Sequence, residues 1–160
     1  MVQTQATGGA VVVRSGEGQI VRWGPAGGTI RVLAGAASTN NSFSIVESTE
    51  PAGSGAPLHV HHGEAEGFYI LDGRVELTCG QEKVTAQAGD FVYTPKDVQH
   101  KYTVLGDKPA RLLLLFSRPG FENFFLEGGS PMDQPPAGPP DMAAMQRLFR
   151  KFDLEVLEGH

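Results

Sequence analysis

Short runs of β-branched and apolar residues, separated by glycine, proline, asparagine and aspartate, make up most of the chain before residue 120. This pattern is typical of antiparallel β proteins, whose strands are short and whose turns use these residues. It predicts strands at 11–13, 19–23, 29–33, 42–47, 74–79, 83–86, 91–94, 100–105 and 111–117. No stretch before residue 120 has a helical periodicity. We therefore expect an all-β sandwich or barrel.

The composition changes after residue 118. Residues 119–126 are compatible with a turn or a one-turn helix, and 128–140, rich in proline and glycine, should cross the surface with little regular structure. Asp141 is a credible N-cap for an amphipathic helix that ends near Lys151. A final extended piece is expected at 153–157. The apolar stripe of the helix consists of Met142, Met145, Phe149 and Phe152.

Length, charge and cysteine content narrow the class of protein. The 160 residues suit one domain, and the net charge of -5, without a basic run, argues against nucleic acid or an anionic membrane as partner. The single cysteine, Cys79, cannot form an intrachain disulfide and is best explained as a small apolar filler. The N-terminus lacks the pattern of a signal peptide, and the longest apolar run, 112–116, is too short for a bilayer. We expect a cytoplasmic protein.

The candidate chemistry lies between residues 53 and 73. His59 and His61 are two residues apart, so on a strand both imidazoles point to the same face, whereas His62 points away. A turn at Gly63 would bring Glu66 back on the adjoining strand beside the two rings. An Asp-Gly pair at 72–73, between apolar-rich strands, signals a second hairpin. These residues predict a metal-binding hairpin, with a fourth ligand further along the chain.

The spacing G-x5-H-x-H-x4-E-x6-G over residues 53–73 and the spacing G-x5-P-x4-H over residues 89–100 resemble the two motifs of the cupin superfamily. The resemblance implies a single-domain jelly roll, the double-stranded β-helix barrel, and makes His100 the fourth ligand. The second motif departs from the family pattern twice. Asp97 replaces a usual glycine, which is mild because aspartate tolerates a left-handed turn, and Val104 replaces a frequent asparagine.

On this reading the chain is one domain in three parts. Residues 51–118 form the metal-binding core, residues 1–50 add strands to the barrel sheets, and residues 119–160 supply the crossing and the C-terminal helix. Related proteins commonly use such N-terminal strands to extend a sheet across a dimer, so we expect a homodimer.

Three neutral imidazoles and one carboxylate suit a single divalent transition metal with open coordination positions. These ligand types do not choose among Ni, Fe, Mn, Co, Cu and Zn. Strand parity places Phe68 and Ile70 on the face of Glu66, and Tyr102 and Val104 on the face of His100. All four are candidate substrate-binding residues, of which Ile70 and Val104 fit ordinary barrel filling equally well.

The ligand set, the single barrel and the C-terminal segment together resemble small quercetin 2,3-dioxygenase-like cupins. The resemblance implies O2-dependent cleavage, with loss of carbon monoxide, of a flavonol-like or other hydroxylated aromatic or enol substrate, with Glu66 as ligand and catalytic base. Two alternatives remain open. One is a non-oxidative isomerase, cyclase or decarboxylase that acts on an enolisable carbonyl, and the other is a ligand-binding cupin without turnover.

Overall fold

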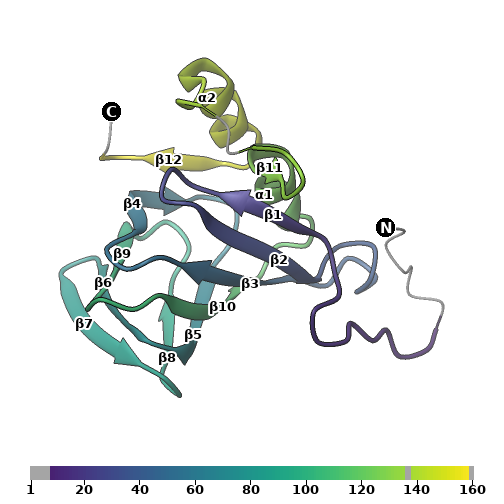
Figure 1. Ribbon diagram of the computed structural model, residues 1–160, viewed down its shortest axis with the longest axis horizontal. Helices are drawn as coiled ribbons and strands as arrows, with labels where there is room; N and C mark the ends of the chain where they lie inside the picture. The colour runs from purple at the N-terminus through teal and green to yellow at the C-terminus, as the bar shows by residue number, and fades with distance from the viewer. Residues whose placement is uncertain (1–7, 136–137, 159–160) are drawn as a thin grey trace.

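Two antiparallel sheets face each other and enclose the hydrophobic core (Figure 1). The computed structural model describes residues 8–135 and 138–158. In order across the sheet, the seven-stranded sheet contains β11 (Ser130–Pro131), β1 (Ile20–Trp23), β2 (Gly28–Ala34), β3 (Ser44–Glu50), β10 (Ala110–Phe116), β5 (Glu66–Asp72) and β8 (Phe91–Thr94). The five-stranded sheet contains β12 (Leu154–Val156), β4 (Gly55–His61), β9 (His100–Val104), β6 (Arg74–Cys79) and β7 (Glu82–Gln87). The predicted all-β jelly roll is confirmed.

Alternation of buried and less buried residues explains how the strands build the core. Along β3 every second residue from Ser44 to Glu50 is buried, and β10 follows the same rule. These buried side chains pack against side chains from the inner face of the five-stranded sheet. The largest fully buried apolar side chains are Phe68, Phe116, Phe121, Ile30, Ile70, Leu77 and Leu112.

The prediction of two hairpins between residues 53 and 79 is wrong. β4 pairs with β9 and β12, whereas β5 pairs with β10 and β8, so the chain changes sheet between them. It changes sheet again between β5 and β6. Gly73 makes the second crossing possible, because its φ is +84° and a Cβ there would lie 2.9 Å from the Cα of Ala110. Both edges of β5 are already paired, which leaves no place for a neighbouring hairpin strand.

The N-terminal segment contributes fewer strands than expected. The strand predicted at residues 11–13 is wrong, since these residues pair with neither sheet, whereas β1 and β2 extend the seven-stranded sheet as predicted. The free edge of β1 is paired with the two-residue strand β11 of the same chain. The Pro-rich crossing therefore contains a short strand that the sequence did not predict.

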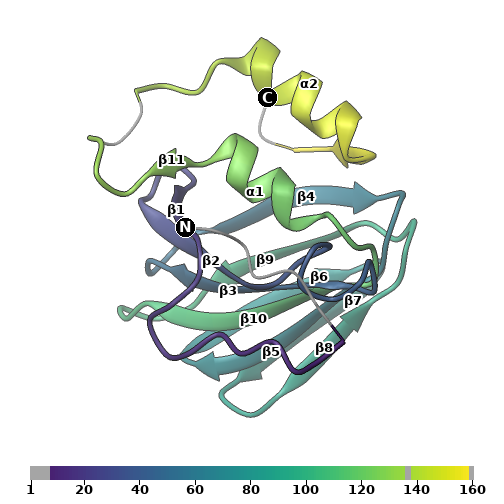
Figure 2. The ribbon, with the colours of Figure 1, turned by 90° about the vertical axis from the view of Figure 1, so that its right-hand side faces the viewer.

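The C-terminal segment gathers at one end of the barrel (Figures 1 and 2). The turn expected near residue 120 is the helix α1 (Glu122–Gly128), and the second helix, α2 (Met142–Lys151), matches the prediction. The side chain of Asp141 caps α2 by accepting hydrogen bonds from the amides of Ala143 and Ala144. The extended piece predicted near residue 155 is β12. Within the described ranges, no helix is long and apolar enough to cross a membrane.

Candidate metal centre

Four side chains from three strands converge at the covered end of the barrel. His59 and His61 lie at the end of β4, Glu66 begins β5, and His100 begins β9. Glu66 faces the three histidines across the interior because β5 belongs to the opposite sheet. All four are buried, with exposed fractions between 1 and 7%. The structure thus brings together the four residues predicted as ligands.

The distances among the four ligand atoms fit one shared cation. The Nε2 atoms of His59 and His61 are 3.1 Å apart, and Oε2 of Glu66 lies 3.0 Å from Nε2 of His61. Oε2 of Glu66 is also 2.9 Å from Nε2 of His100 and 4.0 Å from Nε2 of His59. Ligands about 2.1 Å from a common metal are about 3 Å apart at right angles and about 4.2 Å apart on opposite sides. The cluster is therefore compatible with a divalent metal.

Hydrogen bonds at the other ring nitrogens set the tautomers. Nδ1 of His59 lies 2.7 Å from the carbonyl oxygen of Pro57, and Nδ1 of His100 lies 3.1 Å from that of Val98. Nδ1 of His61 lies 2.7 Å from Oε1 of Glu64. Because carbonyls and carboxylates only accept hydrogen bonds, each Nδ1 carries the proton and each neutral ring turns an Nε2 lone pair inward. Three lone pairs and a carboxylate at such distances need a positive charge between them.

A proton supplies that charge when no metal is bound. Burial acts to lower the pKa of His61, but hydrogen bonds to Glu64 and Glu66 outweigh it and raise this pKa to about 9. Burial, with a contribution from His100, lowers the pKa of His59 to about 4. Burial also opposes the charge of Glu66, yet its close contacts with Nε2 of His100 and of His61 hold its pKa well below the usual value. A metal must therefore displace a proton from His61.

The four predicted substrate-binding residues are all buried in the hydrophobic core, and the rings of two of them lie close to one another near the cluster. The ring of Phe68 is 6.0 Å from that of His100 and 5.5 Å from that of Tyr102, centroid to centroid. The hydroxyl of Tyr102 donates to Oε1 of Glu50 at 3.0 Å, and burial together with the charge of Glu50 raises the pKa of Tyr102 well above its usual value. Side chains of Ile70 and Val104 belong to the hydrophobic core. A role in substrate binding stays a prediction for all four.

Several neighbours of the cluster escaped sequence analysis. The rings of Phe116 and Phe121 lie 5.8 and 5.2 Å from that of His61, and the hydroxyl of Thr94 donates to the carbonyl of Glu66 at 2.9 Å. Glu64 is buried beside His61. Its signal in the sequence is a second carboxylate two residues before Glu66, with the same strand parity. Phe121 has no such signal, because it arrives from the C-terminal segment.

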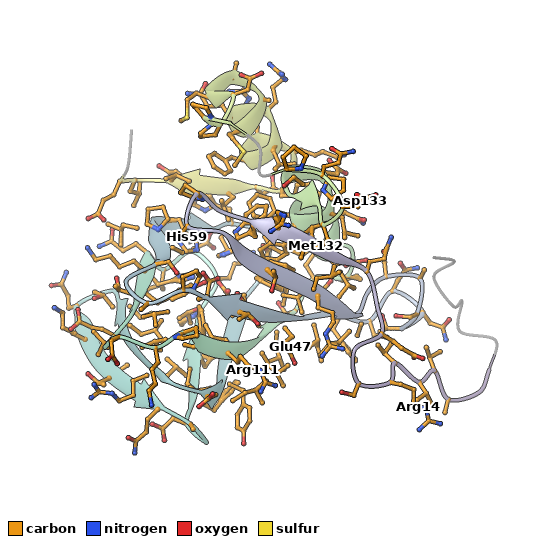
Figure 3. All side chains as sticks on the ribbon, in the orientation of Figure 1. Arg14, Glu47, His59, Arg111, Met132 and Asp133 are labelled. Atoms are coloured by element: carbon orange, nitrogen blue, oxygen red, sulfur yellow. The ribbon has the colours of Figure 1, made fainter. Side chains whose placement is uncertain are left out.

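The C-terminal segment covers the cluster. β12 pairs with the end of β4, so that Leu154 lies opposite His61 and Val156 opposite His59, which Figure 3 shows just below β12. His62 faces outward as predicted, and its ring nitrogens lie 2.8 Å from Asp97 and 2.9 Å from Glu155 of β12. Asp97 has a φ of +66°, which confirms the left-handed turn expected at its position. β12 therefore closes the edge of the ligand-bearing strand.

Two hollows lie on the molecular surface near the barrel. The larger, of about 610 Å³, is on the outer face of the five-stranded sheet and does not include the cluster. The smaller, of about 380 Å³, lies between β8 and the ends of β6 and β7. Its wall includes Cys79, which is paired with His100 across β6 and β9, and Val98, whose carbonyl binds the His100 ring. The larger hollow has a similar neighbour, because its wall includes Pro57, whose carbonyl binds the His59 ring. Both hollows therefore border a residue that supports a ligand.

A jelly roll that buries three histidines and a glutamate at one end defines the class of protein, and the chain belongs to the cupin superfamily. The family described as cupin domain matches residues 46–116, which span the cluster. Quercetin 2,3-dioxygenase of Bacillus subtilis is 32% identical over 122 residues, which are 76% of this chain and 35% of the enzyme. The chain thus spans about a third of the length of that relative.

Solved structures extend the comparison. A predicted oxalate decarboxylase from Thermotoga maritima has 27% identity and a TM-score of 0.61, with 68% of this chain and 99% of the other covered. An RmlC-like cupin from Shewanella frigidimarina has 20% identity and a TM-score of 0.60, with 72% and 96% covered. The second likeness shows the fold alone.

Proposed function

We propose that this protein is a metal-dependent dioxygenase that cleaves a flavonol-like or other hydroxylated aromatic or enol substrate with O2. The observation that carries the proposal is the buried cluster of three imidazoles and one carboxylate, in a chain 32% identical over 122 residues to a quercetin 2,3-dioxygenase. The ligand set suits Ni, Fe, Mn, Co, Cu or Zn, and its chemistry does not choose among them.

The residues of the cluster and the rings around it have separate roles in metal binding and in the exclusion of water. His59, His61 and His100 hold the metal through Nε2, and Glu66 is the fourth ligand. When bound, a divalent metal supplies Lewis acidity toward a substrate hydroxyl and open coordination positions. Rings from the barrel and from Phe121, the N-cap residue of α1, exclude water from the site.

Glu66 is the residue suited to take the substrate proton. The carboxylate has a second oxygen, Oε1, beyond the Oε2 that faces the histidines, and this oxygen can accept a proton while Oε2 remains a ligand. A histidine that captured a proton at its ligating nitrogen would lose the metal. The phenol of Tyr102 keeps its proton, because its pKa is raised and its hydroxyl already donates to Glu50. Tyr102 is therefore not the base.

The test is oxygen consumption on a panel of flavonols. Metal-free protein should be inactive, and protein reconstituted in turn with Ni, Co, Mn and Fe should consume O2 with at least one metal. A matched control is the variant His62→Asn, which removes an exposed histidine outside the cluster and should keep the activity. The panel also includes other hydroxylated aromatic and enol compounds, and absence of oxygen uptake with every metal and every compound would refute the proposal.

A non-oxidative decarboxylase is the second candidate. The Thermotoga structure, described as a predicted oxalate decarboxylase, favours it because the two chains share 27% identity and nearly all of that chain is covered. The same four ligands serve a metal that acts as a Lewis acid on a carbonyl or carboxylate without O2. Release of CO2 from oxalate and other small acids under anaerobic conditions separates this candidate from the first. Metal binding without turnover in either assay would indicate a ligand-binding cupin.

We further propose that the protein is a homodimer. The outer face of the seven-stranded sheet is charged near its centre, where Glu47 pairs with Arg31 at 3.1 Å and with Arg111 at 3.7 Å (Figure 3). Towards its edge, however, β8 exposes Phe91 and Tyr93 by 56 and 60%. An edge strand with exposed aromatic rings favours pairing with a second copy. Sedimentation equilibrium should give twice 17.1 kDa, and a monomer at tens of micromolar would contradict this.

A further inference from the structure

One of the three histidines differs from the other two in the group that accepts the hydrogen bond from its Nδ1–H. His59 and His100 each donate Nδ1–H to a backbone carbonyl two residues earlier in the chain. His61 instead donates to the carboxylate of Glu64, with 2.7 Å between Nδ1 and Oε1. A carboxylate behind a ligating imidazole fixes the ring and makes its other nitrogen a stronger donor.

We propose that Glu64 is a positioning residue for the metal centre, which holds His61 in its ligating tautomer and orientation and adds a second negative charge behind it. The inference rests on the proposed metal site. It does not depend on the reaction, because it concerns the affinity of the cluster for the metal itself.

One oxygen of the Glu64 carboxylate lacks a hydrogen-bond partner among the described residues. The side chain is buried, with 1% exposed, and among the described residues Oε2 has no hydrogen-bond partner. Apart from the ring of His61, which already contacts Oε1 at 2.7 Å, the nearest cationic atom is Nη1 of Arg118, 3.8 Å away, and this atom donates instead to Oδ2 of Asp153 at 2.9 Å. A buried carboxylate left in this state is costly unless a positive charge lies nearby. A metal across the imidazole of His61 provides one.

The charge balance supports the same conclusion. Glu66 and Glu64 together carry two negative charges, which match a divalent cation held by three neutral imidazoles. Arg118 does not change this balance, because it is 34% exposed and its charge is shared with Asp153 at the surface. In a site that excludes water, matched charges favour the bound metal strongly.

A close approach of the chain holds the arrangement together. The guanidinium of Arg118 lies against Gly63, where a Cβ atom would come within 2.5 Å of Nη1. Gly63 therefore leaves room for Arg118 to reach from the end of β10 to Asp153, which precedes β12. Glu64 is thereby enclosed between its histidine and the C-terminal cover.

The test compares Glu64→Gln with Glu122→Gln. Glutamine keeps the size of Glu64 and an oxygen acceptor for His61 while it removes the charge. Glu122 is also a buried carboxylate, but it accepts hydrogen bonds from the amide of Ala36 and the hydroxyl of Ser44, and within the described part of the chain it has no hydrogen bond or ion pair with a histidine. Co(II) affinity, measured by competition with a chelator and extrapolated to the high-pH limit at which His61 no longer binds a competing proton, should fall by about tenfold to a hundredfold for Glu64→Gln. Glu122→Gln should lower the melting temperature but keep the affinity within about twofold.

Two further readouts separate positioning from a merely structural role. In the proton NMR spectrum of the Co(II)-loaded protein, the resonance of the exchangeable Nδ1–H proton of His61 should shift in Glu64→Gln. The corresponding resonances of His59 and His100 should not shift. Glu64→Asp keeps the charge and should recover part of the affinity. If Glu64→Gln binds Co(II) within twofold of wild type, or loses no more than Glu122→Gln, the inference is wrong. It survives if flavonols prove not to be substrates, and wild-type protein that binds no Co(II) would refute the metal site itself.

Discussion

Metal uptake at neutral pH should release at least one proton from the protein. The proton comes from His61, whose pKa of about 9 in the metal-free cluster reflects its position between Glu64 and Glu66. At about pH 7, two units below this pKa, about 99% of His61 is protonated, so metal affinity is about a hundredfold below its high-pH limit. Affinity should therefore rise about tenfold per pH unit between about pH 7 and 9. His59, with a pKa of about 4, is already neutral and contributes no proton.

Calorimetric titration of metal-free protein with Co(II) measures this directly. The observed enthalpy, plotted against the ionisation enthalpy of several buffers, gives the number of protons released. The number should be at least one at neutral pH, and the contribution of His61 should vanish about one unit above its pKa. The variant His62→Asn is the control, because His62 lies outside the cluster and its loss should leave the count unchanged. Uptake without proton release at neutral pH, at an affinity independent of pH, would refute the reasoning.

The remaining predictions concern Glu66, Phe68 and His61. Glu66→Gln should retain part of the metal while turnover per bound metal falls by about two to four orders of magnitude, the usual share of a general base; turnover within about threefold of wild type would leave Glu66 as a ligand only. Phe68→Ala should lower the free energy of unfolding in urea by about 3–5 kcal/mol, because Phe68 is fully buried, and a loss below about 1 kcal/mol would contradict that packing. The raised pKa of His61 stabilises the metal-free fold below about pH 6.5, and thermal unfolding should show this contribution lost as the pH rises through about 9.

The identity of the four ligand residues is the part of the site that the sequence could predict. Two positions of separation suffice to place His59 and His61 on one face, and the two spaced motifs add Glu66 and His100. Runs of β-branched and apolar residues between turn residues likewise indicated strands at 42–47 and 111–117, which the structure places at 44–50 and 110–116, and the spacing of apolar residues indicated α2. These are local properties of the chain.

The sheet to which a strand belongs is not a local property. Asp72 and Gly73 favour a hairpin in isolation, yet the edges of β5 are paired with β10 and β8, so the chain crosses to the other sheet. Nor does the sequence reveal that β12 pairs with β4 over the cluster or that Phe121 packs on His61. Glu64 carried a weak local signal, but its role depends on the burial that the C-terminal segment provides.

The most direct test of the central claim is the metal content of purified protein, measured by inductively coupled plasma mass spectrometry. Wild-type protein should carry close to one equivalent of a divalent transition metal, and His61→Ala and His100→Ala should carry almost none, because each removes a ligand atom that lies 3.0 Å or less from Glu66. His62→Asn should keep the full equivalent. A full equivalent of metal in both alanine variants would show that the metal is held elsewhere and would contradict the assignment of this cluster as the metal centre.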